Sequence, residues 1–206
     1  MIFSFEGIDG CGKTTQVARL AERLEDAGYD VLRVREPGGT DLGEAVRDLL
    51  LDTRRDIHDM AEMLLFSAAR AQLVTERIVP HVQSGGVVVC DRFFDSTVAY
   101  QGGGRRVADV AWLYDFQRRV TAGVEPDRTY LVRVPVDVAA TRLSGRIAAT
   151  GRDRMEHADR DFWVRTSEAY DRLAERAAQR YRVVDGTRPV DDIARAIWSD
   201  AKELTN

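Results

Sequence analysis

The sequence predicts an α/β fold, with a parallel sheet flanked by helices. Segments of strand character alternate with segments of helical periodicity, which implies right-handed crossovers between parallel strands. The segment 86–90 is a continuous apolar run, typical of a strand buried on both faces of such a sheet. A glycine-rich loop also connects the first strand segment to the first helical segment. Because the 206 residues contain neither a repeat nor a linker, we expect one domain over 1–206.

Each element is predicted from its apolar pattern and from the residues that end it. The expected strands are 2–5, 30–35, 86–90, 128–134 and 181–185. The expected helices are 15–24, 41–51, 60–79, 107–121, 137–149, 159–179 and 190–203. The helix 60–79 should end near Pro80, because proline lacks the N–H that continues a helix. In a sheet of this kind, ligands gather at the carboxyl ends of the strands.

The composition is that of a soluble globular protein, with 44% hydrophobic and 31% charged residues. A net charge of −4 argues against broad electrostatic binding of nucleic acid. No apolar run approaches the ~20 residues that cross a bilayer, and the N-terminus lacks the pattern of a secretory signal. The two cysteines do not form a disulfide framework. We therefore expect a cytoplasmic protein with neither a membrane nor a nucleic-acid partner.

The loop from Gly7 to Thr14 fits the pattern G-x-x-x-x-G-K-[ST] and lies between a strand and a helix. Glycines let several backbone N–H groups point at one anion, and the helix N-terminus adds partial positive charge. Lys13 can reach the outer phosphates, and the Thr14 hydroxyl can bind Mg²⁺. The alternative is a glycine-rich turn with a chance lysine, but the flanking elements favour a nucleoside triphosphate site. The expected ATP-binding residues are Gly7, Ile8, Asp9, Gly10, Cys11, Gly12, Lys13, Thr14 and Thr15.

Cys11 allows two interpretations. A thiol at a helix N-terminus can have a lowered pKa and so be open to oxidation. Alternatively, Cys11 is a small residue that fills the loop.

A carboxylate, Asp91, follows the buried strand 86–90 directly. In a fold with such a loop, an acid at this position is a natural partner of Mg²⁺, in part through water. The alternative is that Asp91 caps a turn or a helix. The neighbouring Arg92 would face the same phosphate-binding cleft.

At this point the sequence resembles a known family. The run VCDRFFDSTVAYQ at 89–101 is similar to the signature of thymidylate kinases, and four further blocks agree in order. These blocks are 5–9, 35–40, 65–72 and 153–156. The resemblance implies a P-loop nucleoside monophosphate kinase fold with a five-stranded parallel sheet and a mobile lid at about 143–157. It also implies transfer of the γ-phosphate of ATP to dTMP, with Mg²⁺ as cofactor, in a homodimer.

The resemblance also implies an acceptor site for dTMP. Phe66 would stack on thymine and Arg70 would donate to a base carbonyl, although core packing and a surface charge are the alternatives. Arg92 and Arg47 would hold the phosphate, with a solvated helix face as the alternative for Arg47. Tyr100 would crowd the 2′ position of the sugar. The remaining expected contacts are Asp9 with the sugar and phosphate, Glu36 and Pro37 in the pocket wall, and Ser96, Thr97 and Gln101 with the base.

A group of arginines follows position 141 and resembles the cations of a closing lid. We expect one or two of Arg146, Arg152 and Arg154 to contact the transferred phosphoryl group, with Lys13, Asp9 and Arg92 as the other catalytic residues. The alternative for each arginine is a solvated loop position. Arg142 is expected to stack on adenine. Because the middle of the glycine-rich loop contains no arginine, the missing cation should come from this group.

Two rival functions remain open from the sequence. A deoxynucleoside kinase would need a carboxylate base near a 5′-hydroxyl, and Glu36 is a candidate. A nucleotide-binding switch of the GTPase type usually carries an N-K-x-D motif, which the chain lacks because its only lysines are Lys13 and Lys202.

Overall fold

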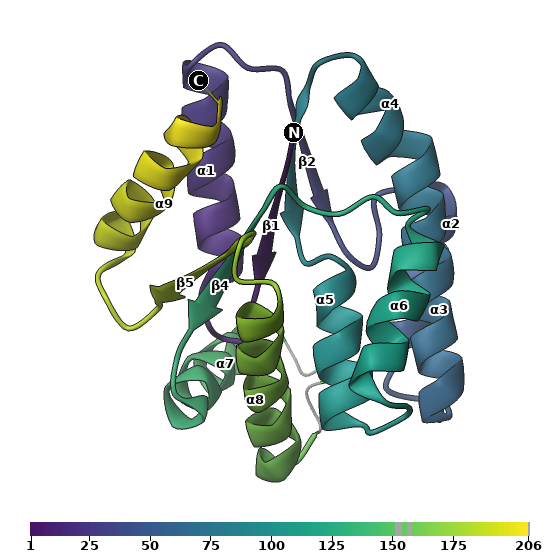
Figure 1. Cartoon of the computed structure of the whole chain (residues 1–206). Coiled ribbons are helices and arrows are strands. Elements are labelled where there is room, and N and C mark those ends of the chain that lie inside the picture. Colours follow the sequence, from purple (N-terminus) through teal and green to yellow (C-terminus); the bar gives the residue numbers. More distant parts are fainter. Residues whose placement is uncertain (151–153, 156–157, 206) are drawn as a thin grey trace.

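The computed structural model describes residues 1–150, 154–155 and 158–205, with the backbone alone at 146 and 148–150. Its centre is a five-stranded parallel sheet in the order β2-β3-β1-β4-β5 (Figure 1). The strands are β1 Ile2–Glu6, β2 Val31–Arg35, β3 Val87–Asp91, β4 Arg128–Arg133 and β5 Tyr181–Asp185. This arrangement confirms the predicted fold class and all five strand segments.

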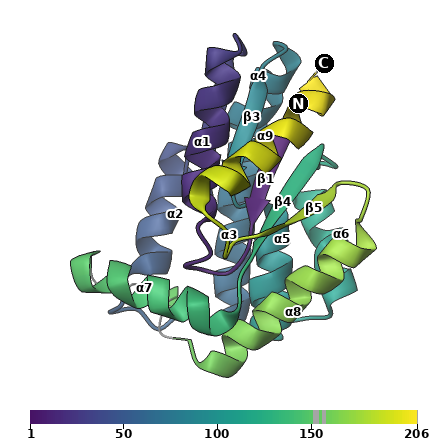
Figure 2. The same ribbon diagram turned by 90° about the vertical axis from the view of Figure 1, so that its left-hand side faces the viewer.

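Helices cover both faces of the sheet. The helices α1 Lys13–Asp26 and α9 Val190–Thr205 pack together on one face, where Figure 2 shows them in front of the strands. The remaining helices are α2 Asp41–Leu51, α3 Asp59–Leu73, α4 Val79–Gln83, α5 Phe94–Thr97, α6 Val110–Val120, α7 Val136–Thr150 and α8 Arg160–Arg176. None of the helices in the described ranges is both long and apolar enough to span a bilayer.

The helix predicted for 60–79 does not end near Pro80. A π-helical segment, η1 Val74–Ile78, joins α3 to α4, so the helical path runs on to Gln83. Pro80 occupies the first turn of α4, a position at which the missing proline N–H costs little. The chain then turns after Ser84, whose N–H bonds to the carbonyl of Pro80.

The sequence pattern also missed a helical stretch after β3, made of α5 and the π-helical segment η2 Val98–Gly104. Three successive glycines, Gly102 to Gly104, argue against a helix by propensity. Here they allow η2 to pack closely on α8, because a Cβ on Gly103 would lie 2.4 Å from the Cβ of Ala169. Tertiary packing therefore outweighs local propensity in this segment, and it places the signature residues along the cleft.

Candidate active site

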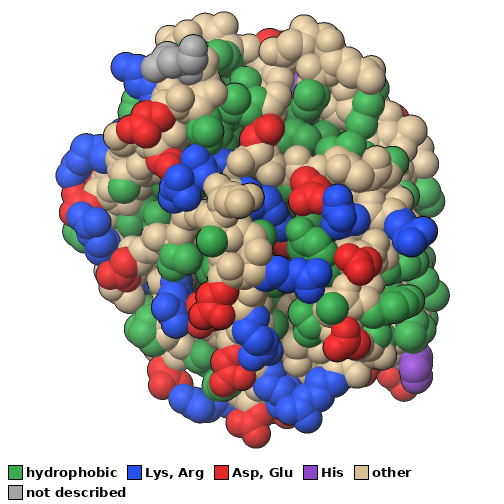
Figure 3. Space-filling view, viewed as in Figure 1, with side chains coloured by type: hydrophobic (Ala, Val, Ile, Leu, Met, Phe, Trp, Pro, Cys, Tyr) green, Lys and Arg blue, Asp and Glu red, His purple; other side chains and the backbone are tan. Residues whose placement is uncertain are grey.

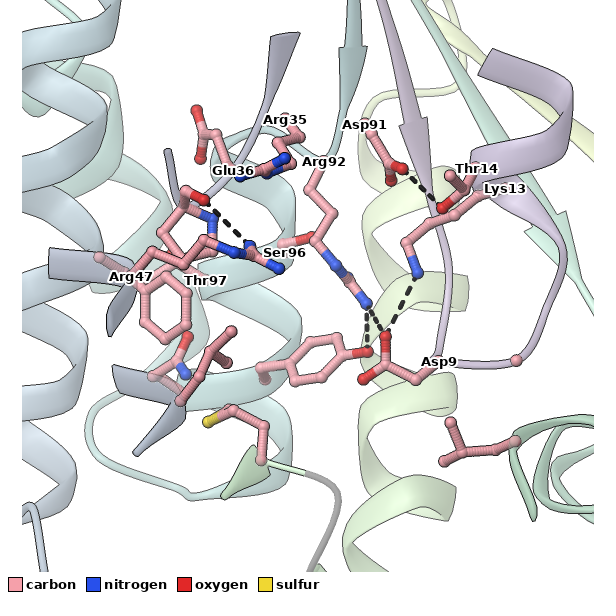
Figure 4. Close-up of a pocket in the computed structure, with 18 of the residues that line it drawn as sticks. Asp9, Lys13, Thr14, Arg35, Glu36, Arg47, Asp91, Arg92, Ser96 and Thr97 are labelled. Atoms are coloured by element: carbon pink, nitrogen blue, oxygen red, sulfur yellow. Dashed lines mark hydrogen bonds and ion pairs between the residues drawn. The ribbon is translucent and has the colours of Figure 1, made fainter. Parts of the chain in front are cut away.

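The glycine-rich loop curls between β1 and α1 in a conformation that its glycines permit. Gly10 and Gly12 adopt positive φ angles of 83° and 97°, which side chains disfavour. A Cβ on Gly10 would also lie 2.3 Å from the carbonyl oxygen of Ala139 in α7. The loop is thus held against α7, and α1 begins at Lys13 with its N-terminus facing the cleft (Figure 4).

A cavity of about 530 Å³ lies at the carboxyl ends of the strands, a size suited to a small-molecule ligand. It joins the glycine-rich loop to the signature segment after β3 (Figure 4). The lining residues are Asp9, Gly10, Gly12, Lys13, Thr14, Arg35, Glu36, Pro37, Arg47, Leu51, Phe66, Asp91, Arg92, Ser96, Thr97, Tyr100, Gln101, Arg142, Leu143 and Met155.

The two expected metal ligands meet at one corner of this cavity. The hydroxyl of Thr14 donates to Oδ2 of Asp91 at 2.6 Å, and both side chains line the cavity (Figure 4). A hydroxyl and a carboxylate are oxygen ligands of the kind that Mg²⁺ prefers. The oxygen donors of this pair therefore fit a magnesium ion.

Arg92 lies at the centre of the cavity wall and is the hub of its polar contacts. Its Nη2 donates to Asp9 Oδ1 at 2.5 Å and to the Tyr100 hydroxyl at 2.7 Å, while Nη1 donates to Ser96 at 2.9 Å. Burial alone would raise the pKa of Asp9, but Arg92 and Lys13 hold this pKa below its usual range. Asp9 thus stays ionised and orients both cations toward the space between them (Figure 4).

Arg92 itself has a positive φ of 75°, an uncommon conformation for a residue other than glycine. Such strain is retained where surrounding contacts determine the position of a residue, and it is frequent in binding sites. This conformation turns the guanidinium from the end of β3 back toward the glycine-rich loop.

A second carboxylate, Glu6, is linked to Arg92 through Ser96, whose hydroxyl accepts a hydrogen bond from Arg92 and donates one to Glu6. It is completely buried and accepts hydrogen bonds from the Phe93 N–H at 2.8 Å, Ser96 Oγ at 2.6 Å and the Tyr170 hydroxyl at 2.8 Å. Burial, aided by repulsion from Asp95, raises the pKa of Glu6 to about 7. Glu6 was not predicted as a site residue, although it lies at the carboxyl end of β1, where ligands bind in such a sheet.

Phe66 of α3 is half-buried among apolar neighbours and lines the cavity wall. Ser96, Thr97, Tyr100 and Gln101 also line the cavity, as their place in the signature predicted. The wall therefore combines an aromatic ring with neutral hydrogen-bonding groups, which suits a nucleobase.

Arg70 lies behind this wall and does not line the cavity. Its side chain is 1% exposed, and its guanidinium donates to Glu36 Oε2 at 2.7 Å, Thr97 Oγ1 at 3.0 Å and Gln117 Oε1 at 2.6 Å. Arg70 is therefore neither a solvated surface charge nor a residue that lines the cavity, the two roles expected from the sequence. The second oxygen of Glu36, Oε1, is buried without a partner among the described residues, and burial raises the pKa of Glu36 despite the attraction of Arg70.

Arg47 and Arg142 both reach the cavity. Arg47 Nη1 donates to the carbonyl of Pro37 at 3.1 Å, on the acceptor side (Figure 4). Arg142 Nη1 donates to the carbonyls of Cys11 at 3.3 Å and Gly186 at 3.1 Å, which places it beside the glycine-rich loop. Both side chains line the cavity, and their contacts with phosphate and adenine stay predictions.

The structure places Arg154 away from the glycine-rich loop. Its Nη2 donates to Glu62 Oε2 at 2.6 Å and its Nε donates to the carbonyl of Leu50 at 2.8 Å. Here Arg154 supplies the counter-charge that the buried Glu62 carboxylate requires, and its contact with a transferred phosphoryl group stays a prediction. The side chain of Arg146 and all of Arg152 lie outside the described residues.

Four of the expected ATP-binding residues do not line the cavity: Gly7, Ile8, Cys11 and Thr15. Ile8 and Cys11 are buried in the core, so their side chains support the loop. Burial raises the pKa of the Cys11 thiol, opposite to the lowered pKa that a reactive thiol needs.

Four residues that line the cavity were not predicted from the sequence: Arg35, Leu51, Leu143 and Met155. Arg35 could have been predicted, because it lies at the carboxyl end of β2, where ligands bind in such a sheet.

The fold and this cavity define a P-loop nucleoside monophosphate kinase, with a triphosphate-binding loop facing an acceptor site across one cleft. The family model of thymidylate kinase matches residues 5–197. The chain is 45% identical to the thymidylate kinase of Thermomicrobium roseum over 201 residues, which cover 98% of the chain and 94% of that protein. It is 44% identical to that of Bifidobacterium longum over 208 residues, which cover 99% and 98%.

A solved structure agrees with these relatives. The crystal structure of thymidylate kinase from Ehrlichia chaffeensis aligns with a TM-score of 0.81 at 30% identity, covering 98% of each chain. The chain belongs to the thymidylate kinase family, whose members are ATP-dependent nucleoside monophosphate kinases.

Proposed function

We propose that the cavity binds ATP and dTMP together and transfers the γ-phosphoryl group to the dTMP phosphate, giving dTDP and ADP for dTTP synthesis. Phosphorylation of dTMP by ATP is the activity of the family to which the chain belongs. One observation carries its assignment to this site: a single cavity joins the glycine-rich loop to the hub at Arg92. An acceptor phosphate is ionised at neutral pH, so the transfer requires positioning and charge neutralisation rather than a strong base.

On the donor side, the glycine-rich loop and Lys13 support binding of the β- and γ-phosphates. Backbone N–H groups of the loop and the N-terminus of α1 supply fixed partial charges, and Lys13 supplies a full one. Arg142 would stack on adenine, and its position beside Cys11 and Gly12 supports this role. The loop thus orients the donor while Arg92 holds the acceptor in line with it.

We further propose that Thr14 and Asp91 hold the Mg²⁺ ion of the ATP complex, directly or through water. A bound Mg²⁺ ion neutralises charge on the β- and γ-phosphates. The hydrogen bond between the two side chains fixes both oxygens at the edge of the cavity next to Lys13 (Figure 4).

On the acceptor side, Arg92 and Arg47 would hold the dTMP phosphate by charge-assisted hydrogen bonds. Asp9 keeps the guanidinium of Arg92 oriented and approaches the sugar, where Tyr100 disfavours a 2′-hydroxyl. Phe66 would stack on thymine, with Ser96, Thr97 and Gln101 offering hydrogen bonds. Arg70 contributes by fixing Glu36 and Thr97, and donation to a base carbonyl requires it to reach through the wall.

The cation that stabilises the transferred phosphoryl group is assigned to the arginines of the segment 143–157. We propose Arg146 and Arg152 for this role, together with Arg154 if it leaves Glu62 when both nucleotides bind. The support for the proposal is that Asp9, Gly10 and Cys11, inside the loop, offer no arginine.

A deoxynucleoside kinase is the weaker alternative. It would need Glu36 as a base, whereas Arg70 occupies Oε2 of this carboxylate through two guanidinium nitrogens. A coupled assay of ADP release with ATP·Mg²⁺ and dTMP, dUMP, UMP, dAMP or thymidine distinguishes these functions. We expect the highest kcat/KM with dTMP; activity with thymidine and none with dTMP would reverse the assignment.

We also propose that the enzyme is a cytoplasmic homodimer. Large apolar side chains are exposed on three helices, α2, α3 and α6, that lie on one side of the molecule (Figure 1). We call them the apolar strip: Leu42, Leu49, Met60, Leu64 and Trp112. Apolar side chains also gather along the right-hand edge of Figure 3, whereas both signs of charge are interspersed elsewhere on that face. An exposed apolar surface of this kind is typical of an interface between subunits.

A further inference from the structure

A buried carboxylate that does not line the cavity contacts one of the residues that do. Glu62 of α3 is 0% exposed, and its Oε1 accepts a hydrogen bond from Nε2 of Gln101 at 2.9 Å. Gln101 lies in η2 and lines the cavity, as does Phe66, which lies one turn after Glu62 on α3. The part of the cavity wall that Gln101 forms is therefore supported by an anion from a neighbouring helix.

Two guanidinium groups balance the charge of Glu62. Arg154 Nη2 donates to Oε2 at 2.6 Å, and Arg105 donates to both carboxylate oxygens at 3.4 Å. Arg105 also lies 3.5 Å from Asp59, one turn earlier on α3. Both oxygens of Glu62 thus face N–H donors, and the side chain serves as a hydrogen-bond acceptor toward Gln101.

This chemistry fixes the orientation of the Gln101 amide. An amide beside a carboxylate must turn its NH2 group toward the carboxylate, because the opposite orientation would oppose two acceptors. The carbonyl oxygen Oε1 then remains for other partners, because the hydrogen bond of the Gln101 side chain within the described residues is the one that Nε2 donates to Glu62. Gln101 Oε1 is thus available as a hydrogen-bond acceptor for a ligand in the cavity.

We propose that Glu62 is a positioning residue that selects the base: it orients Gln101 so that its carbonyl oxygen accepts the N3–H of thymine. Thymine and uracil carry this donor, whereas N3 of cytosine is itself an acceptor and would face the carbonyl oxygen unpaired. A site built around a hydrogen bond rejects a base that lacks the donor far more strongly than it senses a methyl group. This inference rests on the proposed assignment of dTMP to the cavity.

The test compares kcat/KM for dTMP and dCMP in the wild type and in Glu62→Gln. A neutral amide at position 62 can donate as well as accept, so Gln101 is free to turn its NH2 group into the cavity. We expect the ratio of kcat/KM for dTMP to that for dCMP to fall at least tenfold, with the KM for ATP within twofold of the wild type. Asp59→Asn is the matched control, because it removes a charge from Arg105 without touching Gln101, and it should keep the wild-type ratio.

A second variant keeps the test valid if Glu62→Gln does not fold. Glu62→Gln/Arg105→Gln removes one charge of each sign, keeps the net charge of the chain and should show the same fall in the ratio. If either folded variant loses activity equally with dTMP and dCMP, or keeps the wild-type ratio, Glu62 does not orient Gln101 and the inference is overturned. Absence of dTMP phosphorylation by the wild type would instead overturn the proposed function, and this inference with it.

Discussion

At the scale of single residues, Arg92 joins the two halves of the proposed acceptor site. It bonds to Asp9 from the glycine-rich loop and to Ser96 and Tyr100 from the signature segment. Its guanidinium also lies over the Tyr100 ring, 4.7 Å from the centroid. Several contacts in fixed directions require a planar group with separate N–H donors, which lysine does not provide.

We therefore expect Arg92→Lys to lower kcat/KM for dTMP by about 100-fold, because it loses the paired hydrogen bonds while keeping the charge. Steady-state kinetics at varied dTMP and saturating ATP measure this effect. Arg118→Lys, at an exposed ion pair with Glu125, is the control and should behave as the wild type. An unchanged kcat/KM in Arg92→Lys would show that charge alone suffices at this position.

Glu6 makes the stability of the fold depend on pH. Its pKa of about 7 lies above the ordinary 4.5, so the folded state binds more protons than the unfolded state between these values. The free energy of unfolding therefore falls as pH rises from 4.5 to 7, by about 3 kcal/mol from this group alone.

Glu6→Gln should remove this part of the pH dependence. Urea unfolding of both proteins from pH 5 to 8 is the measurement, and the variant should gain stability relative to the wild type as pH rises. Parallel stability curves for the two proteins would mean that Glu6 titrates normally.

At the scale of elements, the glycine-rich loop depends on its contact with α7. We expect Gly10→Ala to lose most kinase activity, because its Cβ would meet the Ala139 backbone at 2.3 Å in a strained positive-φ conformation. Gly28→Ala shares the strain, with a φ of 90°, but its Cβ would meet nothing within 4 Å. It should cost about 1 kcal/mol of stability and leave kcat unchanged. Equal activity in the two variants would contradict the role of the contact.

The arginine segment after α7 is the second element whose role can be tested. Arg152→Ala and Arg154→Ala, made separately, should each lower kcat, because a cation near the transferred group stabilises developing charge. Arg160→Ala, which removes an exposed ion pair with Asp137, is the neighbouring control. Wild-type turnover in both test variants would eliminate these arginines as catalytic residues.

At the scale of the whole molecule, the parallel sheet brings distant segments to one edge. The carboxyl ends of β1, β2 and β3 lie side by side (Figure 1). Residues of the glycine-rich loop, Glu36 and the signature segment therefore line one cavity. The opposite edge of the sheet carries the N-terminus (Figure 1). The helices outside the cleft are then free to form an interface.

The proposed dimer predicts that Leu64→Glu yields monomers. Leu64 is 50% exposed in the apolar strip, and a buried unpaired charge at an interface is costly. Light scattering coupled to size exclusion measures the mass in solution. Val183→Glu is the control, because Val183 is 52% exposed on β5, outside the strip. A monomeric wild type would contradict the proposal directly.

Local pattern was sufficient for all five strands and for most helices, because apolar periodicity reports burial directly. It failed at Pro80 and at Gly102–Gly104, where π-helical turns and close contact with α8 reverse local propensity. It also placed Thr14 and Asp91 in one site, since a phosphate-binding loop and the end of the adjacent strand must meet.

The sequence by itself determined the chemistry of the donor loop, the parallel sheet and the residues that line most of the cleft. Only the tertiary structure decided which charges pair: Arg70 is buried against Glu36, Arg154 bonds to Glu62, and Arg92 bonds to Asp9. The reason is that periodicity records which side of an element is buried, whereas the partner of a buried charge comes from another element. The sequence shows where the arginines and carboxylates stand along the chain, but their pairing depends on how the helices pack on the sheet.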